Sequence, residues 1–262
     1  EAAFERVLAA IDGVDLAPLA RHSPGLVGYG WDNYLRCSVA RVVRVLEALR
    51  RYAPAGGRVL DFGSYFGNFS LACRAAGFAV DAIDGYGEYG ASFATCVELQ
   101  RAAGVTVRDF ADEGFGLPQL TGQFDAVILA GVIEHIPHTP RGVLDTAASV
   151  LAPGGVLILD TPNLAYLYRR LALLEGVSIF SPIQGQYYTE LPFEGHHREF
   201  TVAEVEWLLG AIEHELLSLE TFNYSVFGQQ ELTGDSAAYH HAMVRDPLLR
   251  EIIMTVSRRR HV

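Results

Sequence analysis

Residues 59–71 read VLDFGSYFGNFSL, a short apolar run followed by a turn with two glycines and the start of a helical pattern. A strand, a glycine turn and a helix in this order open the doubly wound sheets that bind nucleotide-like cofactors. Gly63 and Gly67 supply the permissive backbone that a sharp turn needs. Tyr65 stands where a G-x-G turn has its second glycine, so the turn disfavours the close approach of a pyrophosphate.

Apolar runs alternate with helical patterns after this turn. Strands are predicted over residues 58–63, 78–84, 105–110, 124–131 and 156–162, with helices between them over 68–77, 91–104 and 141–155. Two more apolar runs, residues 215–223 and 251–259, predict the last strands. Such alternation predicts βαβ units joined by right-handed crossovers. The predicted fold class is therefore α/β: a Rossmann-like, doubly wound, seven-stranded and mostly parallel sheet with helices on both faces.

The chain of 262 residues, half of them hydrophobic, is long enough for one large α/β domain. Residues 1–262 are expected to form that domain, with a helical cap over 1–55 and the cofactor-binding core over 56–162. The irregular, aromatic segments 163–200 and 223–250 are expected to be insertions, or lids, at the acceptor site. Between them, Thr201 and Glu204 predict a helix that begins with a capping box.

Charge and cysteine content exclude several classes of function. The formal net charge is −11 and the one basic run is residues 258–260, which argues against nucleic acid and anionic membranes as partners. All twenty basic residues are arginine, so mechanisms that use a P-loop or Schiff-base lysine are excluded. The three cysteines, Cys37, Cys73 and Cys96, are widely spaced and favour a reducing, cytoplasmic location. A homodimer is left open.

Four further motifs follow the glycine turn in order. They read AIDGY, RDFADEGFGLP, FDAVILAGVIEHIPH and LAPGGVLILDTPN, within residues 82–163. With the turn, they resemble the class I S-adenosylmethionine-dependent methyltransferases, in the small-molecule branch related to ubiquinone-biosynthesis and sugar methyltransferases. The resemblance covers roughly residues 56–162 and, more weakly, GHHREFTVAEV at 195–205. S-adenosylmethionine carries no phosphate, so Tyr65 departs from the usual small residue without excluding this cofactor.

The resemblance implies a role for each strand end. The turn would hold the methionine end of the cofactor, and a carboxylate at Asp61 suits the ammonium group. Asp84 would bind the ribose hydroxyls, a role that an acid at this position also plays for dinucleotides. Asp109 would accept from the adenine amine, and the Phe110 N–H would meet a ring nitrogen. The predicted cofactor residues are Asp61, Gly63, Ser64, Gly67, Asp84, Gly85, Tyr86, Asp109, Phe110 and Ala130.

Two histidine clusters are candidates for proton transfer. EHIPH places Glu134, His135 and His138 after the fourth strand, and GHHREF places His196 and His197 at the end of the first insertion. His135 is the predicted general base, backed by His196 or His197, and Glu134 completes the candidate catalytic set. For each histidine a purely structural role is the alternative, with Arg198 paired to Glu134. His240 and His241 are expected to be solvated.

A metal site is not expected. Glu134, His135 and a distant histidine are similar to the E-x-x-E-H pattern of magnesium-dependent methyltransferases, but Gly131 replaces the first glutamate. Magnesium prefers several oxygen ligands, and this set offers one carboxylate.

The predicted reaction is methyl transfer to a small-molecule acceptor. A hydroxyl of a sugar or glycosylated metabolite is favoured, because tyrosines gather in residues 27–36 and 180–193. An N-methyltransferase of an amino sugar, a nicotinamide-dependent oxidoreductase and a non-catalytic cofactor-binding partner protein are the alternatives.

Overall fold

The computed structural model describes residues 2–12, 31–110, 120, 122–137, 139–180, 182–188, 195–224 and 234–260. Several predicted features lie outside these residues: His138, the greater part of the RDFADEGFGLP motif, and parts of both tyrosine-containing segments.

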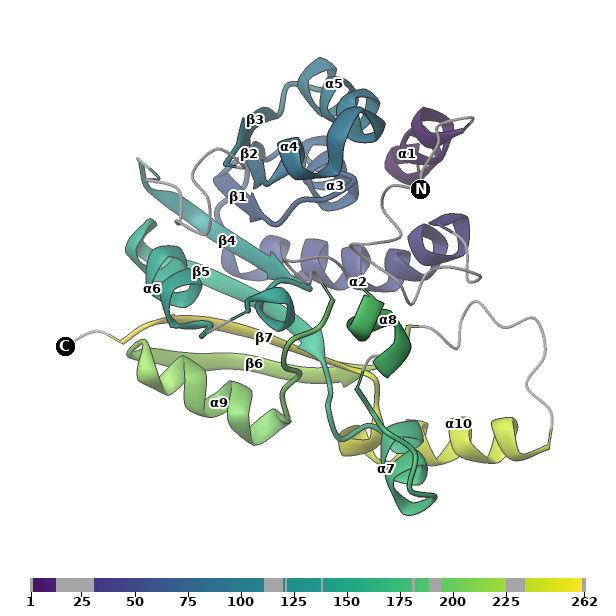
Figure 1. Cartoon of the computed structure of the whole chain (residues 1–262). Coiled ribbons are helices and arrows are strands. Elements are labelled where there is room, and N and C mark those ends of the chain that lie inside the picture. Colours follow the sequence, from purple (N-terminus) through teal and green to yellow (C-terminus); the bar gives the residue numbers. More distant parts are fainter. Residues whose placement is uncertain are drawn as a thin grey trace.

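A mostly parallel sheet forms the centre of the described structure (Figure 1). Its strands are β1 (Arg58–Phe62), β2 (Ala79–Asp84), β3 (Thr106–Asp109), β4 (Phe124–Ala130), β5 (Leu151–Pro162), β6 (His214–Phe222) and β7 (Ile252–Arg259). The seven strands lie in the order β3-β2-β1-β4-β5-β7-β6. The strands β1 to β5 pair in parallel, and β7 runs antiparallel to both β5 and β6. The predicted fold class is confirmed.

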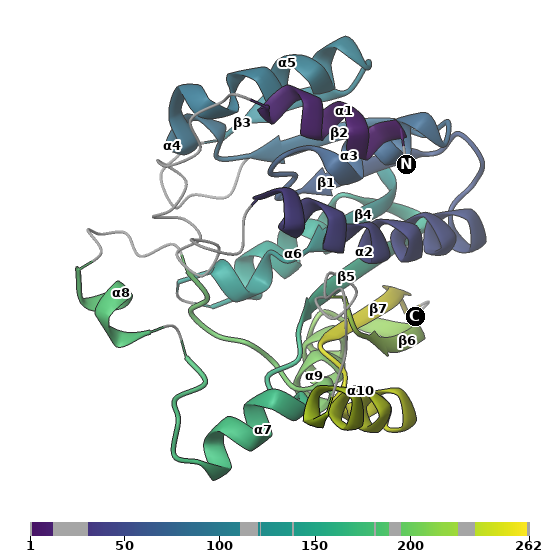
Figure 2. The same ribbon diagram turned by 90° about the vertical axis from the view of Figure 1, so that its right-hand side faces the viewer.

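Helices cover both faces of the sheet (Figures 1 and 2). One core includes α1 (Ala2–Ile11), α2 (Trp31–Tyr52), α3 (Asn68–Ala75) and α5 (Ala94–Ala102); the other includes α6 (Arg141–Ser149) and α9 (Val202–Ala211). Val59 belongs to the first core and Leu60 to the second, because successive strand residues point to opposite faces. Helix α2 therefore packs as part of a layer on the sheet.

The exit from α6 differs from the prediction. The helix ends at Ser149 and β5 begins at Leu151, so the Pro-Gly-Gly segment lies in a strand and not at the end of a helix. Leu151 pairs with Phe124, and the register then shifts so that Val156 pairs with Ala126. A bulge of this kind accommodates Gly154, whose φ of 81° lies in the left-handed region.

The two predicted insertions contain short helices. Residues 163–200 include α7 (Leu167–Leu174) and α8 (Ile183–Tyr188), and we call the described residues 167–180 and 182–188 the α7–α8 arm. Figure 2 shows this arm projecting away from the sheet. Helix α10 (Asp235–Arg245) lies in the second segment. The capping box at Thr201 and Glu204 is confirmed at the start of α9.

The strand order places the site. Parallel strands bring their carboxyl ends to one edge, and the order reverses between β1 and β4, where ligands of such sheets bind. Three short elements follow strand ends: α4 (Tyr86–Tyr89) and the 3₁₀ helices η3 (Gly90–Phe93) and η5 (Ile133–His135). A third 3₁₀ helix, η7 (Pro247–Leu249), precedes β7. No described helix is long and apolar enough to cross a membrane.

Candidate functional site

The glycine turn between β1 and α3 depends on both of its glycines. Gly63 has φ 77° and Gly67 has φ 79°, in the left-handed region that glycine tolerates best. A Cβ on Gly63 would lie 2.5 Å from a Val132 methyl carbon, and one on Gly67 would lie 2.3 Å from the Gln100 side chain. The neighbouring side chains thus pack directly against the bare backbone of the turn.

Tyr65 occupies the position in the turn where a small residue or glycine is usual. Its φ of 49° is also left-handed, and its backbone N–H donates to Asp84 Oδ2 at 2.6 Å. Its ring packs against Phe66 and Phe93, with centroids 4.5 Å and 5.0 Å away, and against Tyr89. The bulky side chain is therefore held in an aromatic cluster, while its backbone orients the carboxylate at the end of β2.

Asp84 offers an oriented acceptor beside this turn. Its carboxylate accepts hydrogen bonds from the N–H groups of Tyr65 and Gly85 and from the Tyr89 hydroxyl. Burial raises its pKa to about 6, against the lowering effect of these donors, so the group is mainly ionised at neutral pH. A carboxylate has about four acceptor positions, and three are used here. The remaining acceptor position therefore fits a hydroxyl donor, such as one from a ribose.

Asp61, predicted to meet the ammonium group of the cofactor, is almost completely buried. It is 1% exposed, and one carboxylate oxygen accepts from Ser70 Oγ of α3 at 2.5 Å. Burial raises its pKa to about 7. Behind the same turn, the hydroxyls of Ser64 and Tyr86 share a hydrogen bond, so both residues brace the turn through side chains that are themselves buried.

The predicted adenine contacts are only partly available. The Phe110 N–H donates to the Asp84 carbonyl oxygen at 3.1 Å, so this donor already has a partner, and its contact with an adenine nitrogen stays a prediction. This hydrogen bond lies one residue beyond Asp109, the last paired residue of β3. Asp109 itself is exposed at the end of β3, and Ala130 ends β4 half-buried at the same edge.

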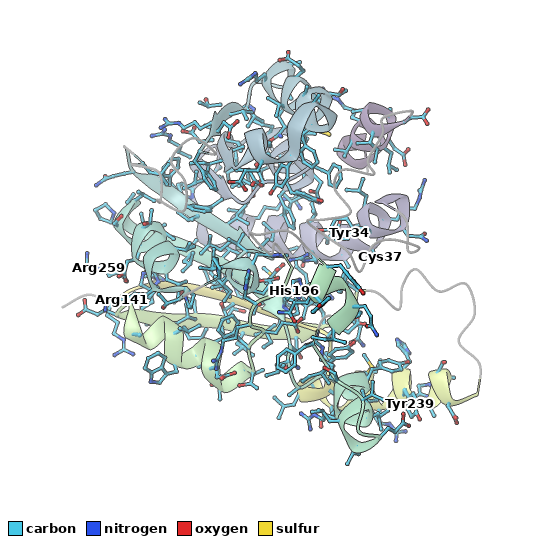
Figure 3. All side chains as sticks on the ribbon, in the orientation of Figure 1. Tyr34, Cys37, Arg141, His196, Tyr239 and Arg259 are labelled. Carbon is cyan, nitrogen blue, oxygen red and sulfur yellow. The ribbon has the colours of Figure 1, made fainter. Side chains whose placement is uncertain are left out.

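The two histidine clusters meet in space. Ligand-type atoms of Glu134, His135 and His196 all lie within 4.8 Å of one another, and the two imidazole rings contact edge to face with centroids 4.6 Å apart. The backbone causes this meeting, because the N–H of His197 donates to the Glu134 carbonyl oxygen at 2.8 Å. Figure 3 shows His196 near the middle of the molecule. The Arg198 side chain does not join the cluster, since its guanidinium binds Glu204.

The two histidines differ as proton acceptors. Burial, followed by the charges of His196 and His197, lowers the pKa of His135 to about 3. Burial also disfavours the charged form of His196, but a hydrogen bond with Glu199 and the charge of Glu134 outweigh it and raise the pKa. The pKa of His196 is therefore the higher of the two, which favours His196 over His135 as the proton acceptor, and the role of either as general base stays a prediction.

A buried carboxylate holds His196 in place. The Nδ1 atom of His196 lies 2.6 Å from Glu199 Oε1, and Arg169 Nη2 donates to the same oxygen at 2.5 Å. Burial would raise the pKa of Glu199, yet the contacts with His196 and Arg169 lower it, so the carboxylate is ionised. Because Nδ1 is engaged by ionised Glu199, Nε2 is the nitrogen of His196 that can contact the molecule to be methylated.

An ion pair that the sequence did not reveal lies beside this cluster. Arg41 of α2 donates to both carboxylate oxygens of Asp160 at the end of β5, and both residues are buried. A Cβ on Gly131 would lie 2.8 Å from Arg41 Nη2 and 3.5 Å from Glu134 Oε1. The only hint in the sequence is an arginine within the otherwise small and apolar run CSVARVV.

This arrangement does not fit magnesium. Where the E-x-x-E-H pattern would place a second carboxylate, Gly131 leaves room and the Arg41 guanidinium fills it. The guanidinium, already paired with Asp160, stands where an oxygen ligand would be needed, so the set offers magnesium only the one carboxylate of Glu134.

Removal of divalent metals should therefore leave activity unchanged. We expect equal rates of methyl transfer before and after dialysis against EDTA, measured with the acceptor described below. A loss of activity that magnesium restores would contradict this reading of Gly131 and Arg41.

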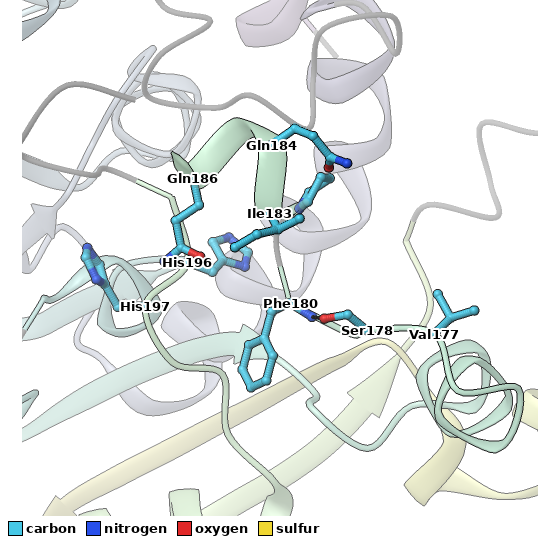
Figure 4. A pocket seen from close by; sticks show the side chains of 9 residues that line it. Val177, Ser178, Phe180, Ile183, Gln184, Gln186, His196 and His197 are labelled. Carbon is cyan, nitrogen blue, oxygen red and sulfur yellow. Dashed lines mark hydrogen bonds between the residues drawn. The ribbon is translucent and has the colours of Figure 1, made fainter. Parts of the chain in front are cut away.

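A cavity of about 570 Å³ lies next to the histidine cluster, a volume typical of small-molecule sites (Figure 4). Apolar side chains of the α7–α8 arm surround it, together with polar groups from the arm and from the two histidines at 196 and 197. Its lining residues are Val177, Ser178, Phe180, Pro182, Ile183, Gln184, Gln186, His196 and His197.

The greater part of the chain matches a known protein family. A family described as "Methyltransferase domain" matches residues 32–219. The chain is 36% identical over 121 residues to the ubiquinone biosynthesis O-methyltransferase of Xanthomonas axonopodis pv. citri (strain 306), covering 46% of this chain and 49% of that protein. The corresponding enzyme of Pseudomonas aeruginosa (strain LESB58) is 33% identical over 121 residues, covering 45% of this chain and 51% of that protein. The chain thus spans about half the length of these curated relatives.

Solved structures share the fold. Magnesium protoporphyrin IX methyltransferase from Synechocystis PCC 6803, solved with bound SAH, is 17% identical with a TM-score of 0.55, over 92% of this chain and 97% of that one. A putative methyltransferase from Haloferax volcanii, in complex with the Trm112 methyltransferase activator, is 16% identical with a TM-score of 0.56 over 98% of both chains.

Proposed function

This chain belongs to the methyltransferase-domain family, and from that premise we propose that it transfers a methyl group from S-adenosylmethionine to a hydroxyl of a small molecule. The observation that carries the proposal is the Asp84 carboxylate, oriented beside the glycine turn with an acceptor position left for a ribose hydroxyl. When bound, S-adenosylmethionine supplies a methyl group already activated on sulfur.

The residues of this chain would hold the cofactor along the carboxyl edge of β1, β2 and β4. The turn from Gly63 to Gly67 would receive the methionine end, and Asp84 the ribose. Asp109, the exposed last residue of β3, remains the candidate for the adenine amine. The half-buried Ala130 lies where β4 ends and the histidine cluster begins, so the methyl group would face His196.

His196 would accept the proton of the acceptor hydroxyl. Ionised Glu199 holds Nδ1 and thereby keeps the lone pair on Nε2. His135, with its lowered pKa, would stay neutral and confine the acceptor, and Glu134 would stabilise the protonated His196. Alignment of the hydroxyl with the methyl group supplies much of the remaining rate enhancement.

The lining of the cavity supports the proposed class of acceptor. Two glutamines, a serine and two histidines can hydrogen-bond hydroxyls, whereas Val177, Phe180 and Ile183 offer apolar contact. This mixture supports a glycosylated metabolite, with its sugar at the histidines and its apolar aglycone against the arm.

Matched glycosides test this proposal. The full chain would be incubated with S-adenosylmethionine and phenyl β-D-glucopyranoside, methyl β-D-glucopyranoside or phenol, and mass spectrometry would detect methyl ethers. We expect methylation of the phenyl glycoside, about tenfold slower turnover of the methyl glycoside because its apolar contact is lost, and none of phenol. Methylation of phenol alone would contradict a sugar acceptor. Tight cofactor binding with no product from a broad acceptor panel would favour a non-catalytic protein.

A further inference from the structure

We propose that Arg169 is a positioning residue that acts through Glu199 on His196 and so links the α7–α8 arm to the base. The inference rests on the proposed role of His196. It assigns a function to an arginine that is outside the set of residues lining the cavity.

The contacts form a continuous chain of charged groups. Arg169 places its two terminal nitrogens on the two carboxylate oxygens of Glu199, with Nη2 2.5 Å from Oε1. The same Oε1 meets Nδ1 of His196 at 2.6 Å. The Glu199 side chain is 6% exposed and that of Arg169 19% exposed, so water screens this bidentate pair weakly.

The arm fixes the far end of this chain. Arg169 lies in the first turn of α7, and its guanidinium sits 5.5 Å from the centre of the Tyr166 ring. Further along, the arm contributes Val177 and Phe180 to the cavity. One structural unit therefore carries both the wall of the acceptor site and the counter-ion of the carboxylate that orients His196.

The charge of Arg169 should affect the pH range in which His196 can accept a proton. The groups that face His196 are Glu199 from its own segment, Glu134 and His135 from η5, and Arg169 from α7. The two carboxylates favour the protonated imidazole, and Arg169 opposes them. Without Arg169, Glu199 would hold the protonated ring more strongly, so His196 would become a free base only at higher pH.

The test is a titration of His196 in the full chain. The protein would carry ¹⁵N-labelled histidine, the His196 signals would be assigned with His196→Gln, and the imidazole shifts would be followed against pH. Arg169→Met would be compared with wild type, with Arg169→Lys as the conservative variant, and with Arg170→Met. Arg170 is the matched control, because it is the next residue of α7 and bonds only the carbonyl oxygens of Ala165 and Leu248 among its described contacts.

We expect the His196 titration to move to higher pH in Arg169→Met, less in Arg169→Lys and not in Arg170→Met. In Arg169→Met, the acid limb of the plot of methyl-transfer rate against pH should also move to higher pH. The rate at neutral pH should fall roughly tenfold and recover at higher pH. A wild-type titration in folded Arg169→Met, or an equal shift in Arg170→Met, would overturn the proposal. If Arg169→Met does not fold, the comparison of Arg169→Lys with wild type decides. The titration needs no turnover, so failure of the proposed reaction would be seen separately as absence of product.

Discussion

His196→Gln should lower the rate of methyl transfer by about 10²–10⁴-fold, the range that a positioned general base contributes. Glutamine keeps a polar side chain of similar reach, but it cannot accept a proton near neutral pH. The carboxylate of Glu199 would still find an N–H donor, so the fold of the segment should persist. Single-turnover rates with the phenyl glycoside would measure the effect.

Cofactor affinity and a second variant serve as controls for this result. S-adenosylhomocysteine should bind His196→Gln as it binds wild type, because the residue lies outside the cofactor turn. His135→Gln should cost much less, since a histidine with a pKa near 3 contributes little as a base at neutral pH. A larger loss in His135→Gln than in His196→Gln would restore His135 as the base.

Asp84→Asn should weaken the binding of S-adenosylhomocysteine by roughly a hundredfold, as expected when a hydrogen bond to a charged group is lost. The amide can present only one oxygen, whereas Asp84 now receives donors from Tyr65, Gly85 and Tyr89. Its NH₂ group would face one of these donors, so the turn would also lose its brace. Isothermal titration calorimetry measures the affinity directly.

Asp81→Asn is the matched control for Asp84→Asn. Asp81 lies three residues earlier on β2 and pairs with Arg58 and Arg108, away from the turn. The Asp81→Asn protein should bind S-adenosylhomocysteine with the affinity of wild type. Near-UV circular dichroism would show that Asp84→Asn is folded. Unchanged affinity in a folded Asp84→Asn would remove this carboxylate from the cofactor site.

The sequence predicts the sheet well for a physical reason. Strands buried on both faces are near-continuously apolar, as Ala126–Ala130 of β4 are, and glycines follow the ends of α3 and α5. The error at residues 150–155 arises where the rule is weakest. A Pro-Gly-Gly segment is typical of a helix exit, but a bulge against Phe124 lets the same residues extend β5.

Part of the site also follows from sequence order. Asp84 ends the parallel strand β2 and Glu134 lies in the 3₁₀ helix that follows β4, so the fold brings them to one edge. The meeting of Glu134 with His196 depends on backbone contacts, from the N–H groups of His197 and Arg198 to the Glu134 carbonyl oxygen, which no spacing rule predicts.

The remaining features depend on tertiary contacts between distant residues. Arg41 and Asp160 are 119 residues apart, and Arg169 and Glu199 are 30 apart. Neither pair has a spacing typical of a motif. The choice between His135 and His196 depends on burial and neighbouring charge, which differ only once the chain is folded.

Calorimetric titration of the full chain with S-adenosylhomocysteine, and then with NAD under the same conditions, tests the central claim most directly. We predict micromolar binding of S-adenosylhomocysteine and none of NAD, because Tyr65 closes the turn to a pyrophosphate while Asp84 stays open to a ribose. Binding of NAD without S-adenosylhomocysteine would contradict the claim and assign the turn to hydride-transfer chemistry.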